Sequence, residues 1–96
     1  MVFNEAITTR GLLAFTYDGH DRVVIPAAHG RHATTGNSVL RAYQIGGTGK
    51  TGAVPFWRLF RQSKIVSPHL TGGTFTENPP GYRRDDAGIS PIECQL

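Results

Sequence analysis

The sequence predicts one small domain that is built mainly from β-strands. The chain has 96 residues, which is enough for a single modest hydrophobic core. Its 12 glycines and 6 prolines favour many tight turns over a bundle of helices. Apolar and aromatic residues recur in short runs between these turn residues, and this pattern is typical of strands packed around one core.

The first predicted element is a short helix over residues 3–10. Asn4 is a suitable N-cap, and Gly11 follows as a stop signal. The apolar face of this helix comprises Phe3, Ala6 and Ile7. We therefore expect a short amphipathic helix at the start of the chain.

A β-hairpin is predicted next. The apolar and aromatic run at 12–17 is followed by turn residues at 18–21 and by a β-branched run at 22–26. Two such runs around a short polar turn indicate antiparallel strands.

Two further strands are predicted, over 38–45 and 56–61, after a turn at 33–37. Residues of 38–45 alternate with period two, which is the period of a strand. One predicted face carries Val39, Arg41, Tyr43 and Ile45, and the other carries Leu40, Ala42 and Gln44. A glycine-rich loop is expected between the two strands.

The C-terminal part loses this periodicity from about residue 67. We expect an irregular tail that crosses the surface, with disorder as the alternative. Its expected anchor points are Leu70, Phe75, Tyr82 and Ile92. The predicted division is a β-domain over 3–70 and a partly ordered extension over 71–96.

The charge of the chain favours an anionic partner. The net charge is +3, and eight arginines outnumber two lysines. The planar guanidinium suits phosphate, carboxylate and base edges. A merely solvated basic surface is the alternative.

Cysteine usage and hydropathy indicate the compartment. Cys94 is the chain's one cysteine, so no internal disulfide can form and a reducing cytoplasm is expected. The sequence shows no signal-peptide pattern and no long apolar run, so membrane insertion is not expected.

A phosphate-loop motif is only partly present. Gly49, Lys50 and Thr51 match its second half, but the first required glycine is replaced by Gln44. No helix is predicted after Thr51, and such a helix is what directs backbone N–H groups at the phosphates. We therefore interpret this stretch as a connecting loop.

Catalytic and metal-binding patterns are weak. His29 and His32 stand three apart, and we interpret them as exposed loop histidines, with zinc or an anion as the alternative. No nucleophile motif is present, so no catalysis, metal or cofactor is expected. The run 83–86, Arg-Arg-Asp-Asp, is interpreted as a mutually compensated surface cluster.

Arginines interleaved with aromatic residues form the most coherent candidate site. Arg41 and Tyr43 share a predicted strand face, while Arg58 and Arg61 flank Phe60. Such a surface can stack bases and neutralise phosphates, as single-strand-binding proteins do. The alternative is that the aromatic residues pack in the core and the arginines are ordinary surface residues.

The order of these features resembles the WYL domain family. Tyr17, Arg22 and Pro26 match its first motif, and Leu40, Ala42 and Tyr43 match its second. The third motif is matched by Phe60, Arg61, Lys64 and Ile65. The resemblance covers about residues 5–70, but Ser38 and Val39 replace the Trp and Tyr that name the family.

This resemblance implies a small Sm-like or SH3-like β-barrel. It also implies a non-catalytic, ligand-sensing module that binds nucleic acid or a nucleotide-like anion in bacterial transcription regulation or phage defence. The implied ligand contacts are Arg41, Tyr43, Arg58, Arg61 and Lys64. A protein-interaction or oligomerisation module without an anionic ligand is the alternative.

Overall fold

The computed structural model describes residues 2–47 and 55–96. The elements run in the order α1 (Val2–Thr9), β1 (Gly11–Tyr17), β2 (His20–His32), β3 (Ser38–Gly47), β4 (Phe56–Arg61), the 3-10 helix η1 (Gln62–Lys64), β5 (Val66–Thr74) and β6 (Ile89–Gln95). The fold is therefore mainly β with one short N-terminal helix, as the sequence predicts.

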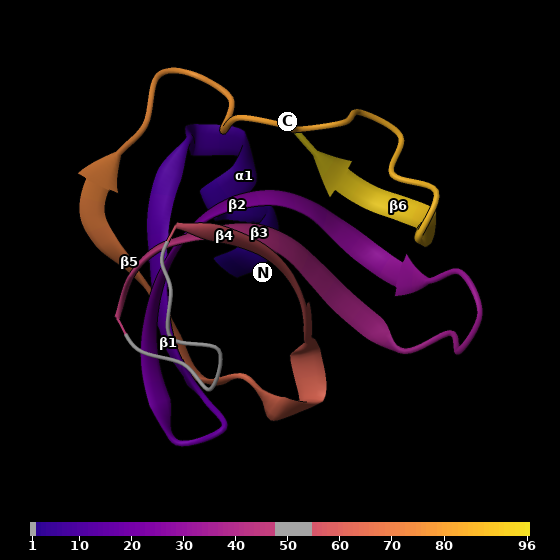
Figure 1. Ribbon diagram of the computed structural model, residues 1–96, viewed down its shortest axis with the longest axis horizontal. Coiled ribbons are helices and arrows are strands. Elements are labelled where there is room, and N and C mark those ends of the chain that lie inside the picture. Colours follow the sequence, from indigo (N-terminus) through magenta and orange to yellow (C-terminus); the bar gives the residue numbers. More distant parts are fainter. Residues whose placement is uncertain (1, 48–54) are drawn as a thin grey trace.

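All strand pairings form a single antiparallel sheet (Figure 1). The strand order is β4-β3-β2-β1-β5, and β6 pairs with β2. Within the described residues, no ladder joins β4 to β5, so the two ends of the sheet stay open. Closure of the predicted barrel is not found.

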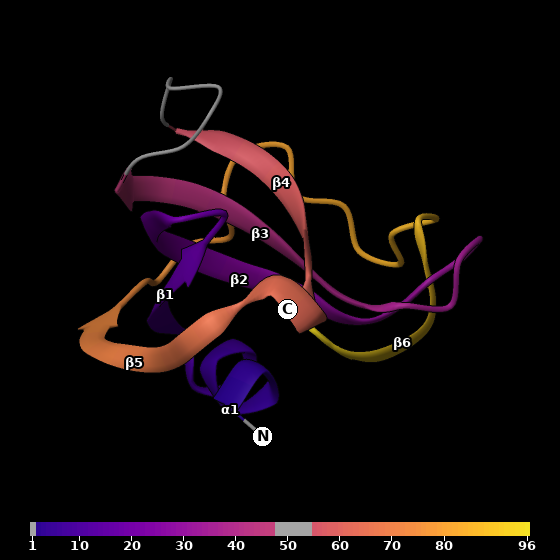
Figure 2. The same ribbon diagram turned by 90° about the horizontal axis from the view of Figure 1, so that it is seen from below.

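The main core lies on the inner face of the sheet, where α1 packs. Figure 2 shows α1 against one side of the strands, and its contacts reach β1, β2, β5 and β6. The buried core residues are Phe3, Ala6, Ile7, Leu13, Phe15, Tyr17, Val24, Leu40, Ala42 and Phe60. Burial of these side chains supplies the main driving force for folding.

The N-terminal helix confirms its predicted apolar face but not its predicted ends. α1 begins at Val2, so Asn4 lies inside the helix and is not its N-cap; its Oδ1 lies 2.8 Å from Nδ1 of His29. At the other end Arg10, not Gly11, takes the left-handed conformation, with φ of 57°.

Among the described residues, no helix is long and apolar enough to cross a bilayer.

The β1–β2 hairpin is confirmed, but β2 continues well beyond Pro26. One half of β2, residues 20–24, pairs with β1, and the other half, residues 28–32, pairs with β6. Pro26 lies where the partner changes, with a register shift in its ladder with β3. A proline lacks the N–H that a continuous ladder needs, so this position tolerates it.

The C-terminal part is more regular than the sequence predicts. The predicted boundary at residue 70 falls inside β5, and β6 is a complete strand on β2, so the expectation of an irregular tail is wrong there. Gly30 permits this close pairing, because a Cβ at that position would collide with the Pro91 carbonyl. β6 helps cover a second small cluster on the outer face, formed by Ala28, Val39 and Ile89 with Leu59 and Ile92.

Candidate anion-binding groove

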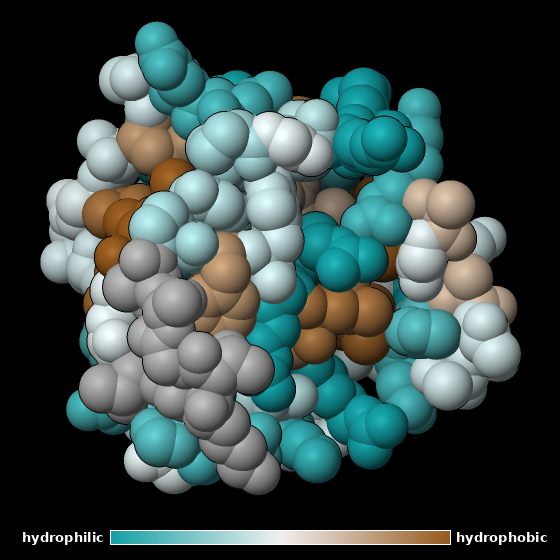
Figure 3. All heavy atoms as spheres, viewed as in Figure 1, coloured by the Kyte–Doolittle hydropathy of each residue, from teal (hydrophilic) through white to brown (hydrophobic). Residues whose placement is uncertain are grey.

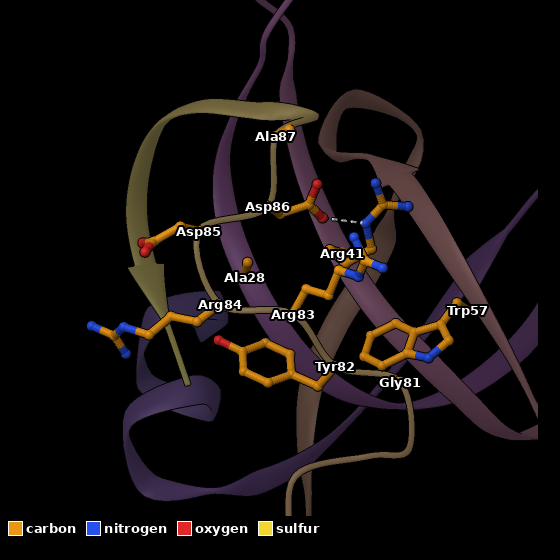
Figure 4. A pocket seen from close by; sticks show the side chains of 10 residues that line it. All are labelled: Ala28, Arg41, Trp57, Gly81, Tyr82, Arg83, Arg84, Asp85, Asp86 and Ala87. Carbon is orange, nitrogen blue, oxygen red and sulfur yellow. Dashed lines mark hydrogen bonds and ion pairs between the residues drawn. The ribbon is translucent and has the colours of Figure 1, made fainter.

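A hollow lies between β3, β4 and residues 75–88, the segment that joins β5 to β6 and crosses these strands (Figure 4). We call residues 75–88 the crossing segment. Its volume is about 420 Å³. It lies on the outer face of the sheet, away from the α1 core. Its lining residues are Ala28, Arg41, Trp57, Gly81, Tyr82, Arg83, Arg84, Asp85, Asp86 and Ala87, and we call it the outer groove.

Strand alternation directs Arg41 and Tyr43 to this outer face. Their neighbours Leu40, Ala42 and Gln44 share the opposite face, as the sequence predicts, and the structure buries this inner face. Tyr43 stands opposite Trp57 in the β3–β4 ladder, and their ring centroids are 5.2 Å apart. The alternation therefore places an aromatic pair and an arginine on one surface.

Hydrogen bonds hold the C-terminal segment over this surface. Trp57 donates from Nε1 to the Pro80 carbonyl at 2.7 Å. Tyr82 donates its hydroxyl hydrogen to the Leu96 oxygen at 2.8 Å, and burial raises the pKa of Tyr82. These two hydrogen bonds thus fix the positions of the Trp57 indole and the Tyr82 phenol, which form walls of the groove.

An ion pair closes one part of the groove. Arg41 Nε donates to Asp86 Oδ2 at 2.7 Å, and Gly88 N–H donates to the other carboxylate oxygen at 2.8 Å. Burial alone would raise the pKa of Asp86, but these hydrogen bonds outweigh burial and hold the pKa below its usual value. Asp86 is therefore a charged internal partner of Arg41.

The two arginines of the crossing segment point in different directions. Figure 4 shows Arg83 directed to the same side of the groove as Arg41 and the Trp57 ring, whereas Arg84 points the other way. Arg84 donates to the Leu96 oxygen at 2.9 Å. Arg83 is exposed and has no carboxylate within 4.0 Å among the described residues.

The run 83–86 is not the mutually compensated cluster that the sequence suggests. Asp86 pairs with Arg41, and Asp85 accepts a hydrogen bond from Gln95 at 2.9 Å. The charges of the run are distributed between β3 and β6 because the segment lies between these strands. Sequence proximity alone therefore gave the wrong partners.

Arg58 lies on the other side of the sheet from Arg41. It stands opposite Ala42, and its guanidinium lies 5.3 Å from the Tyr17 ring centroid and 5.6 Å from that of Phe60. Its NH2 is 3.8 Å from Asp18 Oδ2. The predicted contact residues are thus divided between two faces.

Arg61 and Lys64 lie at the end of β4 and in η1, outside the outer groove. Both are exposed. They line a separate hollow together with residues of the β2–β3 turn. Of the five predicted contact residues, only Arg41 lines the outer groove, and the Tyr43 ring lies beside the Trp57 ring of its wall at a tilt of 58°.

The two neighbouring histidines lie in β2 rather than in a loop. His29 is 2% exposed, and its ring nitrogens lie 2.8 Å from Asn4 Oδ1 and 3.1 Å from Gln62 Oε1. His32 Nδ1 accepts hydrogen bonds from the backbone of the following turn. In the described part of the chain, no group of three or more potential metal ligands occurs.

The surface around the groove is mixed in polarity. Figure 3 shows brown hydrophobic side chains among teal ones where β3 and β4 run in Figure 1, and more brown at the left, near β1 and β5.

The partial phosphate-loop motif, Gly49 to Thr51, lies outside the described residues. Gln44, the residue that breaks this motif, is buried in β3.

No family model, curated protein or solved structure matches this chain. The function of the groove is therefore inferred from its own residues.

Sequence reasoning did not assign Trp57, Tyr82 or Arg83 to the outer groove. Trp57 could have been found by extending the alternation of β3 across the ladder to β4, whereas the crossing segment gives no periodic signal.

Proposed function

We propose that this protein is a non-catalytic binding module that holds nucleic acid or a nucleotide-like anion in the outer groove. The observation that carries the proposal is the convergence of Arg41 and Arg83 with the Trp57 ring beside one hollow (Figure 4). Guanidinium groups neutralise phosphates, and aromatic rings stack on bases. Tyr43, whose ring packs against that of Trp57 in a tilted arrangement, extends the aromatic surface.

The electrostatics of the groove favour an anion at Arg83 first. Arg41 is already paired with Asp86, whereas Arg83 has no acidic partner in the described residues. A phosphate can therefore be neutralised at Arg83 without breaking an existing ion pair. Binding of this kind weakens as salt rises, because bound counterions are released from the nucleic acid.

The resemblance to WYL domains supports the same function and a finer fold assignment. We assign the sheet to the Sm-like or SH3-like class. Its order β4-β3-β2-β1-β5, in which β5 returns to β1, supports this assignment because such a strand order can curl toward a barrel. A bacterial regulatory or phage-defence role is part of the proposal.

Fluorescence anisotropy with labelled short single-stranded DNA and RNA tests the proposal. We expect saturable binding that weakens about five- to tenfold between about 50 mM and about 200 mM salt. Arg83→Ala should weaken binding about tenfold, because a charge-assisted hydrogen bond at an exposed arginine contributes about 1.5 kcal/mol, the lower end of the range for such bonds. Arg31→Ala is the matched control and should bind nearly as the wild type does, because Arg31 is an exposed arginine of β2 that does not line the outer groove.

Two results would contradict the proposal. One is no saturable binding to either oligonucleotide at the lower salt concentration. The other is equal weakening by Arg83→Ala and Arg31→Ala, which would indicate attraction by net charge alone.

A protein-interaction module is the second candidate function, and the open sheet supports it. β4 and β5 are the outer strands of the sheet, and β5 exposes Val66 (57%) and Leu70 (37%). An exposed apolar edge is a template for pairing with another strand. Concentration-dependent self-association in sedimentation experiments, abolished by Leu70→Lys, would favour this function.

A further inference from the structure

A second hollow lies between the β2–β3 turn and the end of β4. Its volume is about 230 Å³. Its lining residues are Tyr17, His32, Thr35, Asn37, Val39, Leu59, Arg61 and Lys64. We call it the Arg61 hollow; it shares no lining residue with the outer groove.

The charge in the Arg61 hollow is uncompensated. Arg61 and Lys64 are exposed, and within the described residues neither has a carboxylate oxygen within 4.0 Å. No Asp or Glu lines the hollow. In contrast, Arg41 and Arg58 each have an aspartate partner. An anion that enters this hollow therefore competes with no acidic side chain there.

The imidazole of His32 adds a donor of defined position. Its Nδ1 accepts hydrogen bonds from the backbone N–H of Thr34 at 3.1 Å and of Thr35 at 3.2 Å. A ring nitrogen that accepts a hydrogen bond carries no proton, so the neutral ring bears its hydrogen on Nε2. The ring is thus held in the tautomer whose remaining polar atom is a donor.

The buried phenol of Tyr17 adds a further donor. Tyr17 is 5% exposed, and its hydroxyl oxygen accepts the backbone N–H of Arg61 at 3.2 Å. No acceptor for the hydroxyl hydrogen occurs in the described parts of the chain, 2–47 and 55–96. This contact also ties the Tyr17 ring to the strand that carries Arg61.

We propose that the Arg61 hollow binds a phosphate ester group. It combines two cations with the His32 and Tyr17 donors and the Asn37 amide, and it offers no competing carboxylate. Phosphate oxygens accept several such hydrogen bonds at once, and charge-assisted bonds are the strongest of them. The apolar side chains of Val39 and Leu59, which also line the hollow, suit the carbon atoms of an attached sugar.

The size of the hollow selects a small ligand. Its volume lies below the range of about 300–1,000 Å³ that is typical of pockets for drug-sized molecules. One phosphorylated sugar fits this space better than a dinucleotide does. The group can come from a free nucleotide or from the backbone of a nucleic acid, and the experiment below separates these sources.

Nuclear magnetic resonance titration of the full chain tests this assignment. Thymidine monophosphate, thymidine and a short oligothymidine are added separately while the backbone amide signals of Thr34, Thr35 and Arg61 are followed. We expect saturable shifts with a phosphorylated probe and none with thymidine. Saturation by the monophosphate indicates a free nucleotide, and saturation by the oligothymidine alone indicates a nucleic-acid backbone.

Two single-charge variants make the test specific. Arg61→Ala should weaken phosphate binding at these amides about tenfold, because a charge-assisted hydrogen bond is lost while the backbone contact to Tyr17 remains. Arg84→Ala removes the same charge from the segment between β5 and β6, which does not line the Arg61 hollow, and should leave this binding unchanged. Thermal melting of both variants shows whether they stay folded.

The assignment is overturned by no saturation with either phosphorylated probe, by equal shifts with thymidine, or by equal weakening in the two variants. If Arg61→Ala does not fold, Lys64→Ala takes its place in the titration, and we expect the same weakening. Because the Arg61 hollow and the outer groove share no residue, failure here leaves the groove proposal standing, and the reverse also holds.

Discussion

Arginines lie beside aromatic rings on both faces of the β3–β4 ladder, but their surroundings differ. On the inner face Arg22 is 1% exposed and donates to Gln44 Oε1 at 3.1 Å and to the Tyr17 carbonyl at 3.2 Å. On the outer face Arg83 is exposed beside a hollow. The first arginine is part of the packing, and the second is available to a ligand.

The inner arrangement is a stack of cations and rings. The guanidinium groups of Arg22 and Arg58 both lie within 5.7 Å of the Phe60 ring centroid. Burial, followed by the neighbouring charge of Arg58, lowers the pKa of Arg22. Similar residue types thus give packing on one face and a candidate binding surface on the other. Strand positions place Arg22 and Arg58 on the inner face, whereas the path of the segment between β5 and β6 brings Arg83 to the outer face.

The largest expected effect comes from removing the ring at the centre of the inner stack. Phe60 is fully buried and makes edge contacts with Phe15 and Tyr17, each at 5.0 Å between centroids. Phe60→Ala should lower the free energy of unfolding by about 3–5 kcal/mol, because a large cavity replaces the ring. Urea denaturation measures this loss, with the partly exposed Phe75→Ala as the control. A loss below about 1 kcal/mol would contradict the inner placement.

Arg22→Met should have the next largest effect. The substitution keeps the apolar stem but leaves the Tyr17 carbonyl and the Gln44 amide without their guanidinium donor. We expect a loss of about 2–4 kcal/mol in the free energy of unfolding. Arg83→Met, the matched change on the outer face, should stay within about 0.5 kcal/mol of the wild type. Equal losses in the two variants would remove the distinction between the faces.

The Arg41–Asp86 pair should make a smaller contribution that depends on pH. The lowered pKa of Asp86 in the folded state means that the ion pair stabilises the fold above the unfolded carboxyl pKa. This contribution is lost as the pH falls through the folded pKa. Asp86→Asn should therefore cost up to about 1 kcal/mol at neutral pH and nothing at strongly acidic pH. Melting temperatures of both proteins across acidic pH measure the difference, and a constant gap between them would exclude this ion pair as its source.

The smallest effect is expected on the exposed side of β5. Val66 is 57% exposed, so Val66→Thr should change the free energy of unfolding by less than about 0.5 kcal/mol. Chemical denaturation checks this value. A larger loss that depends on protein concentration would show that the side chain is covered in a self-associated form.

Much of the fold could be predicted because local patterns decide it. The apolar spacing of α1 identified its buried residues, including Ala6, and the alternation of β3 separated its two faces correctly. β5 was missed because its sequence shows no alternation of buried and exposed positions. β6 and the second half of β2 were missed because neither has a regular alternation of its own. Their pairing depends on Gly30, which lets a segment some sixty residues away approach closely.

The candidate site was only partly predictable for the same reason. Arg41 and Tyr43 follow from the alternation of one strand. To predict that Arg58 lies on the inner face, one must know the register of β4 against β3, because Ala42 and not Arg41 stands opposite Arg58. To predict that Arg83 lies at the groove, one must know the path of the irregular segment that carries it, and no local pattern specifies that path.

The chain's single tryptophan, Trp57, lines the outer groove and gives the most direct test of the proposed function. Its intrinsic emission can be followed while a short oligothymidine is added at about 50 mM salt. Stacking of a base on the indole should quench the emission saturably, and Arg83→Ala should shift the titration to about tenfold higher oligonucleotide concentration. Binding that leaves the Trp57 emission unchanged, or no binding at all, would contradict a nucleic-acid site in this groove.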